Sequence, residues 1–167
     1  TTLLAGIVPL LHGGAEQVGQ KLLDLPWVPG ETQRIQTDYS FLLSQQGDPL
    51  SKQLARRWEG RKFHTLKVLT GSTDNRGAFL EWAAHTFGVK KVIIGLDPDS
   101  SDFEPKRLKK LPMEVRIVPL PASPRPHSKF YFFEGKKDFG AIVGSANCSA
   151  AAWLTPLESG GNTELVV

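Results

Sequence analysis

The feature that most constrains the fold is a strand–helix–strand pattern between residues 63 and 96. Residues 63–70 (FHTLKVLT) and 91–96 (KVIIGL) are short runs rich in β-branched and apolar residues. Between them, residues 75–87 carry apolar side chains at helical spacing, and Gly88 follows where a helix would end. This order predicts a crossover connection, a parallel pair of strands and an α/β fold.

The second half of the chain predicts further strands and helices, and a mixed sheet sandwiched by helices. Residues 119–126 contain four prolines and predict a stiff, extended loop. The other expected elements are a short helix over 105–111, strands over 114–119, 129–133, 141–143 and 163–167, a charged turn over 134–138, and a helix over 150–154.

The first sixty residues are less regular. Residues 15–25 have helical spacing, 39–43 fit a strand or a helix, and 44–60 fit a helix. We therefore divide the chain into residues 1–62, an N-terminal part of the domain, and residues 63–167, its core. The sequence lacks an initial Met and stops on an apolar run typical of mid-strand. These features favour a segment of a longer, multidomain protein.

Composition excludes some classes of protein. The 167 residues include one cysteine, Cys148, so no disulfide can form within the chain, which fits a reducing, cytoplasmic setting. The apolar run 3–11 is too short to span a membrane, which takes about 20 residues. A net charge of +3 is compatible with a polyanionic substrate but does not diagnose one.

Three short segments near the C-terminus carry reactive side chains. His127 and Lys129 flank Ser128 just before a β-rich run, and side chains two apart on a strand share a face. Gly144-Ser145-Ala146-Asn147 follows a strand, so a hydroxyl, an amide and helix N–H groups can form an anion pocket. Glu164 enters the last strand and can orient an imidazole.

Together these groups suit phosphoryl chemistry. They supply a nucleophilic imidazole, a cation and an amide for the nonbridging oxygens, and a carboxylate partner. No member of the set demands a metal or another cofactor. The remaining histidines show no paired spacing, which makes a zinc site unfavourable.

The runs HSKFYFFE, GSAN and NTE resemble one half of the phospholipase D superfamily, closely over residues 127–164. The resemblance implies a phospholipase D-like fold with one half-site per chain. It implies that His127 is the nucleophile or general acid, and that Lys129 and Asn147 hold the phosphate. Ser145 would hydrogen-bond within that pocket, and Glu164 would fix the tautomer of the histidine.

One position departs from the family motif. The motif's aspartate falls at residue 134, which is Glu134 here. In the family this acid is generally a structural partner rather than the attacking group, so the reactive set remains complete.

The resemblance also implies a second histidine that this sequence does not supply. The pair His64 and Lys67, followed by GSTDN, looks like a degenerate copy, but a gap of three residues places the two side chains on opposite faces of a strand. The second histidine is therefore expected from a symmetric dimer partner or from another half of the protein.

Three functions remain open at this point. The first is a metal-independent nuclease that forms a phosphohistidine intermediate. The second is a phospholipid hydrolase or phosphatidyltransferase, and the third is a non-catalytic binding module.

Simpler roles also remain open for individual residues. Ser145 and Asn147 can cap a helix, Glu164 can be a strand-edge charge, and Cys148 is better explained as a packed thiol than as a nucleophile. The basic pairs can follow a nucleic-acid backbone or lie on solvated faces; they are Arg56-Arg57, Arg61-Lys62, Lys90-Lys91, Lys106-Arg107 and Lys109-Lys110.

Overall fold

The computed structural model describes residues 40–96, 103, 105–120 and 129–167. Residues 42–167 form one compact unit. Its strands are β1 (Leu42–Leu43), β2 (Thr65–Thr70), β3 (Lys91–Leu96), β4 (Glu114–Pro119), β5 (Lys129–Glu134), β6 (Phe139–Gly144) and β7 (Leu165–Val166). Its helices are α3 (Leu50–Arg57), α4 (Ala78–Phe87), α5 (Pro105–Leu108) and α6 (Ala150–Trp153), with a 3-10 turn over Leu157–Ser159.

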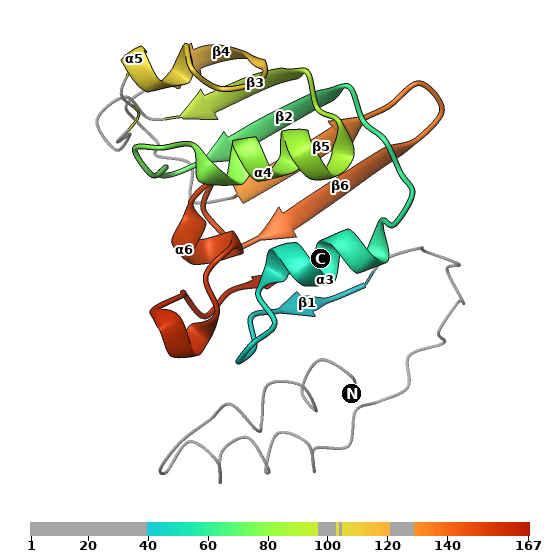
Figure 1. Cartoon of the computed structure of the whole chain (residues 1–167), viewed down its shortest axis with the longest axis vertical. Helices are drawn as coiled ribbons and strands as arrows, with labels where there is room; N and C mark the ends of the chain where they lie inside the picture. Colours follow the sequence, from blue (N-terminus) through green and yellow to red (C-terminus); the bar gives the residue numbers. More distant parts are fainter. Residues whose placement is uncertain (1–39, 97–102, 104, 121–128) are drawn as a thin grey trace, which may run out of the picture. The chain divides into compact units, whose positions relative to one another are not determined.

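The seven strands form a single mixed sheet with the order β1-β7-β6-β5-β2-β3-β4 (Figure 1). Strands β2, β3 and β4 are mutually parallel, and the other neighbours are antiparallel. The parallel pair predicted for residues 63–70 and 91–96 is thus confirmed, and so is the α/β class. Residues 42–57 contribute β1, which pairs with β7, and α3, whose Leu50 and Leu54 are buried.

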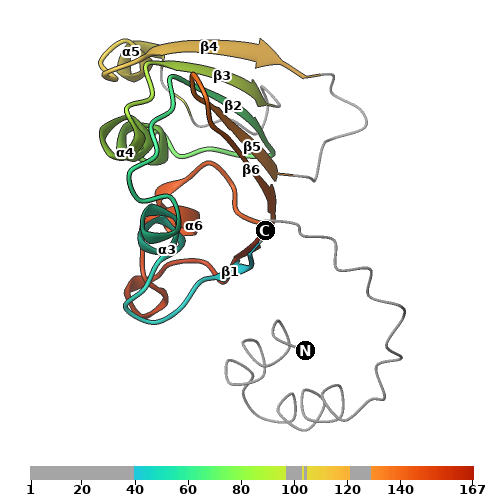
Figure 2. The same cartoon turned by 90° about the vertical axis from the view of Figure 1, so that its right-hand side faces the viewer.

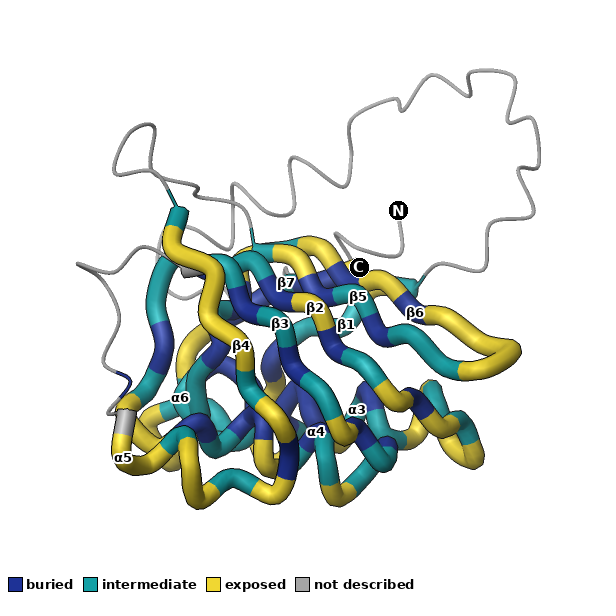
Figure 3. Tube along the Cα trace, turned by 90° about the horizontal axis from the view of Figure 1, so that it is seen from above, coloured by how far each residue is buried: buried dark blue, intermediate teal, exposed yellow. Residues whose placement is uncertain are grey.

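Helices α3, α4 and α6 lie against the same face of the sheet (Figure 2). Helices were expected on both faces, but no helix that the structure describes covers the other one. Along β5, buried Tyr131 and Phe133 alternate with Phe130 and Phe132, which point to this open face. Phe139 on β6 is 69% exposed and Val143 is 45% exposed, so the open face carries exposed apolar side chains. Figure 3 shows where buried and exposed positions lie along the strands.

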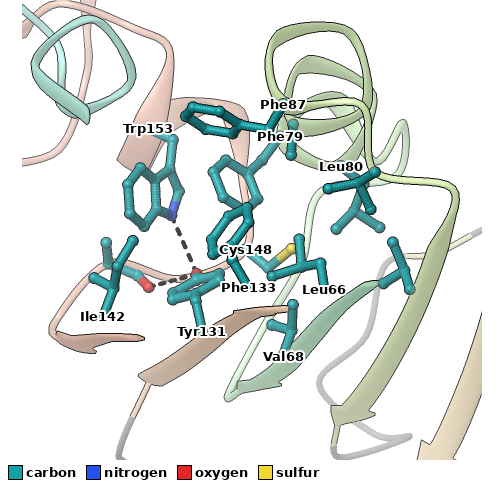
Figure 4. Close-up of a cluster of buried hydrophobic side chains, with 14 of the residues drawn as sticks. Leu66, Val68, Phe79, Leu80, Phe87, Tyr131, Phe133, Ile142, Cys148 and Trp153 are labelled. Atoms are coloured by element: carbon teal, nitrogen blue, oxygen red, sulfur yellow. Dashed lines mark hydrogen bonds between the residues drawn. The ribbon is translucent and has the colours of Figure 1, made fainter. Parts of the chain in front are cut away.

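The core between the helices and the sheet combines aliphatic side chains with a cluster of aromatic rings (Figure 4). Phe79 of α4 stacks on Trp153 of α6, with ring centroids 4.6 Å apart, and both residues are fully buried. At the other end, Trp58 packs edge-on against Phe133 with centroids 5.1 Å apart. A side chain at Gly140 would lie 2.6 Å from Trp58, so a glycine is needed where the indole meets β6.

Several predicted elements are shorter than the patterns suggested. Helix α4 begins at Ala78 rather than at residue 75, because the Asp74 carboxylate accepts the N–H groups of Arg76, Gly77 and Ala78. The last strand spans only Leu165–Val166, and helix α3 covers only the middle of residues 44–60.

Candidate active site

Four of the predicted site residues, Lys129, Ser145, Asn147 and Glu164, lie at one end of the sheet. Lys129 opens β5 and pairs with Gly144, the last residue of β6. Thr70 ends β2, next to the pair formed by Leu69 and Phe130. Three strands thus bring Lys129, Thr70 and the GSAN segment together at what we call the Lys129 end. His127 lies outside the described residues, two positions before Lys129.

Ser145 and Glu164 are in direct contact. The Ser145 hydroxyl donates to Glu164 Oε2, and Asn162 Nδ2 donates to Glu164 Oε1 at 3.2 Å. The Glu164 side chain is buried, and its backbone N–H donates to Ser44 Oγ at 3.1 Å. A carboxylate with two oxygens offers about four acceptor positions, so Glu164 can still accept an N–H from a further group.

Gly144 explains why the GSAN segment begins with a glycine. A Cβ at this position would collide with the Leu165 carbonyl and lie 2.7 Å from Val166 Cα. The missing side chain therefore lets β7 approach β6 closely, and the Ser145 hydroxyl accepts the Leu165 N–H at 3.0 Å. This close approach brings Glu164 to Ser145.

Asn147 lies beside the end of β2. Its Oδ1 is 3.4 Å from Thr70 Oγ1, and the next N–H along the chain, that of Cys148, donates to the same hydroxyl at 3.1 Å. Thr70 is fully buried, and Thr73 forms a β-bridge with Cys148. The segment 70–74 therefore runs directly against the Asn147 loop.

Two N–H groups of the helix that follows Asn147 are bonded to protein oxygens and are therefore not available to an anion. The Ala150 N–H donates to Asp74 Oδ2 at 2.6 Å, and the Ala152 N–H donates to the Ser149 hydroxyl at 3.3 Å. Since protein oxygens already accept these donors, Lys129 and the Asn147 amide remain as the candidate phosphate contacts. The capping role falls to Ser149 rather than to Ser145 or Asn147.

A buried hydrogen-bond network of Tyr131 and Trp153 holds the backbone next to Asn147 (Figure 4). The Tyr131 hydroxyl donates to the Ala146 carbonyl at 2.8 Å and accepts from Trp153 Nε1 at 3.1 Å. Burial raises the pKa of Tyr131 well above its usual value. Burial, reinforced by the charge of Asp74, likewise raises the pKa of the Cys148 thiol above its usual range. The structure thus supports a packed, protonated Cys148 rather than a nucleophile.

Two further sequence candidates lie at the opposite end of the sheet. Glu134 is five residues beyond Lys129, about 17 Å along an extended strand. It pairs with Lys67 on the open face, with Nζ and Oε2 3.2 Å apart. The His64 N–H donates to the Glu134 carbonyl, so the degenerate His64–Lys67 pair is also remote from Lys129.

The described residues place few other constraints on chemistry. Among them, no group of three or more His, Cys, Asp or Glu side chains is arranged to hold a metal ion. None of the described helices is long and apolar enough to cross a membrane.

Comparison with known proteins adds little. No family model matches the chain, and no curated protein matches it. Among solved structures, a yeast tyrosyl-DNA phosphodiesterase mutant aligns with a TM-score of 0.46 and 11% identity, covering 76% of this chain and 31% of that one. Polyphosphate kinase from Porphyromonas gingivalis aligns with a TM-score of 0.44 and 15% identity, covering 87% of this chain and 25% of that one. Both likenesses are weak, and this chain spans less than a third of the length of either protein.

Sequence reasoning missed the contribution of the β2–α4 segment. Thr70 and Asp74 both contact the Asn147 loop, although more than seventy residues separate them from it. The run GSTDN looks like part of a degenerate copy of the motif, and nothing in its sequence indicates a contact with Asn147. The antiparallel pairing of β2 with β5 places that turn at the Lys129 end, because β2 ends where β5 begins.

Proposed function

We propose that this chain is a metal-independent phosphodiesterase, with a nuclease as the best-supported subtype and one half-site per chain. The observation that carries the proposal is the convergence described above. Lys129, Asn147, Ser145 and Glu164 come from three separate sequence segments and gather at one end of the sheet. A purely structural role for each residue would not require this grouping.

The proposed reaction proceeds in two displacements. His127 attacks phosphorus, forms a phosphohistidine bond and expels the leaving oxygen, which takes a proton from a second histidine. That second histidine then removes a proton from a water molecule, and the water oxygen attacks phosphorus. This attack breaks the P–N bond, restores His127 and releases the phosphate ester. Lys129 and Asn147 would stabilise the charge on the nonbridging oxygens in both steps.

Glu164 would hold His127 in the attacking tautomer by accepting its other ring N–H. Its carboxylate is buried and already fixed by Ser145 and Asn162. A carboxylate held on two sides can orient an imidazole with little loss of freedom on binding. We propose that Ser145 acts through Glu164 rather than on the substrate.

The second histidine would come from a second copy of the chain or from another half of the protein. In an isologous dimer, a two-fold axis beside His127 would place its own copy opposite. Such a dimer would have two complete sets of Lys129 and Asn147 around one phosphate.

Nucleic acid is the proposed substrate, and the net charge of +3 and the pI near 9.1 are compatible with such a polyanion. One observation favours a second candidate, a phospholipid. The open face of the sheet exposes Phe139, Phe130 and Val143, a surface that could rest against acyl chains. A lipid enzyme would use the same Lys129 end.

The test is cleavage of single-stranded DNA, RNA, bis(4-nitrophenyl) phosphate and phosphatidylcholine vesicles in excess EDTA. We expect the wild-type protein to cleave a nucleic acid and His127→Ala to be inactive. Loss of wild-type activity in EDTA would refute the metal-free mechanism, and cleavage of phosphatidylcholine alone would select the lipid candidate. Sedimentation of the active species measures whether two copies are required.

A further inference from the structure

We propose that Asp74 and Thr70 are positioning residues that hold Asn147 in place for catalysis. This inference rests on the proposed function, because it assigns them a part in that same site. Neither residue belongs to the three motif segments: Thr70 is the last residue of β2, and Asp74 lies in the segment that joins β2 to α4.

Asp74 connects two helix N-termini through its two carboxylate oxygens. Oδ1 accepts the N–H groups of Arg76, Gly77 and Ala78 at 2.9, 2.7 and 3.3 Å, at the start of α4. Oδ2 accepts the Ala150 N–H at 2.6 Å, at the start of α6. One side chain therefore ties the helix that follows Asn147 to the helix that follows β2.

Thr70 holds the other side of the same loop. Its buried hydroxyl donates to the Ser72 carbonyl at 2.9 Å and accepts the Cys148 N–H at 3.1 Å. Asn147 lies between Ala146, whose carbonyl is held by Tyr131, and Cys148, held by Thr70. The backbone on each side of Asn147 is thus anchored, with a third anchor at Ala150.

The anchoring matters because an amide that stabilises charge in a transition state must be aimed before the reaction begins. Residues that only orient a functional group typically affect its performance about 10- to 100-fold. We expect losses of that size in kcat, with smaller changes in KM, when either anchor is removed.

Asp74→Asn separates positioning from simple helix capping. An asparagine oxygen can still accept the α4 N–H groups, and Asn caps helices about as well as Asp. Its NH2 group would then face the Ala150 N–H, so the contact with α6 is lost. We expect Asp74→Asn to be destabilised no more than the Ala83→Gly control described below, while kcat falls about tenfold or more.

The Thr70 pair of variants follows the same logic. Thr70→Val keeps the shape but removes the acceptor for the Cys148 N–H, whereas Thr70→Ser keeps the hydroxyl. We expect kcat to fall in Thr70→Val and to be restored in Thr70→Ser. Ala83→Gly, inside α4 and remote from these contacts, is the control for destabilisation, and its kcat should match the wild type.

A readout without substrate distinguishes failure of this inference from failure of the proposed function. NMR of the full chain would follow the Asn147 side-chain amide and the hydrogen exchange of the Ala150 and Cys148 N–H groups. We expect the Asn147 resonances to shift in Asp74→Asn and Thr70→Val, with faster exchange at Ala150 and Cys148 respectively. Unchanged resonances and exchange would overturn the positioning role, whether or not the wild type cleaves phosphodiesters. Shifted resonances with an unchanged kcat in an active enzyme would overturn it too.

Discussion

The two ends of strand β5 differ in how their polar groups are held. At the Lys129 end, Ser145, Asn147 and Glu164 are tied by hydrogen bonds to β7 and to the segment after β2. At the Glu134 end, the acid forms one exposed ion pair with Lys67 on the open face. The contrast separates the groups that we propose for catalysis from a motif position whose side chain pairs with a neighbouring strand.

The largest expected effect tests this contrast between the two ends of β5 directly. We predict that Asn147→Ala and Lys129→Met each lower phosphodiesterase activity about 100- to 1,000-fold, since each would remove a group that stabilises transition-state charge. Glu134→Ala, at the other end of the same strand, should stay within about twofold. Steady-state kinetics on a nucleic-acid substrate measure all three. Equal losses in Asn147→Ala and Glu134→Ala would remove the distinction between the two ends.

A second prediction concerns the buried support beneath Asn147. Tyr131→Phe removes the hydroxyl that serves both the Ala146 carbonyl and Trp153 Nε1, leaving two buried polar groups without that partner. We expect the free energy of unfolding to fall by about 1–3 kcal/mol. Chemical denaturation measures this loss. Phe133→Leu, a core change without a polar group, should destabilise the protein but leave kcat closer to wild type than Tyr131→Phe does. If Tyr131→Phe proves neutral, the network does not stabilise the loop.

A third prediction follows from the raised pKa values of Cys148 and Tyr131. The unfolded chain ionises these groups near their usual pKa values, about 8.5 and 10, while the folded protein keeps both protonated. Their contribution to stability is therefore complete below about pH 8.5 and is lost as the pH rises. Each group contributes a slope of about 1.4 kcal/mol per pH unit above its unfolded pKa. In Cys148→Ala the fall in stability should begin nearer pH 10; an onset unchanged from the wild type would contradict the assignment to Cys148.

The smallest effect is expected at the Glu134 end. The Lys67 and Glu134 side chains are 47% and 41% exposed, so water and salt screen their attraction. Glu134→Gln should change the free energy of unfolding by about 1 kcal/mol or less, and the change should shrink further in high salt. A larger, salt-independent loss would show that Glu134 has a structural role beyond this pair.

The parts of the fold that could be predicted depend on local pattern. The parallel pair β2 and β3, helix α4 and strands β4 to β6 follow from periodicity and turn residues near in sequence. The exact start of α4 could not be predicted from periodicity, because it depends on which N–H groups donate to the Asp74 carboxylate. The face left open by the described helices also could not be inferred, since alternation along β5 does not say which layers cover it.

The candidate site was predictable for a related reason. Lys129, Ser145 and Glu164 lie at the ends of β5, β6 and β7, which follow one another in the chain and pair antiparallel in the sheet, so pairing between neighbouring strands brings them together. Thr70 and Asp74 reach the same end only through the pairing of β2 with β5, which links positions about sixty residues apart. Their role depends on a long-range register that a single sequence does not express. The division between residues 62 and 63 and the source of the second histidine remain predictions.

The most direct test of the central claim is to trap the intermediate. Full-length protein would be mixed with a short oligonucleotide in EDTA, quenched in mild alkali, digested and analysed by mass spectrometry. The account predicts a nucleotide joined through phosphorus to the peptide that contains His127. This adduct should be absent in His127→Ala and greatly reduced in Asn147→Ala. Turnover without an adduct, or an adduct on His64 at the opposite end of the sheet, would contradict it.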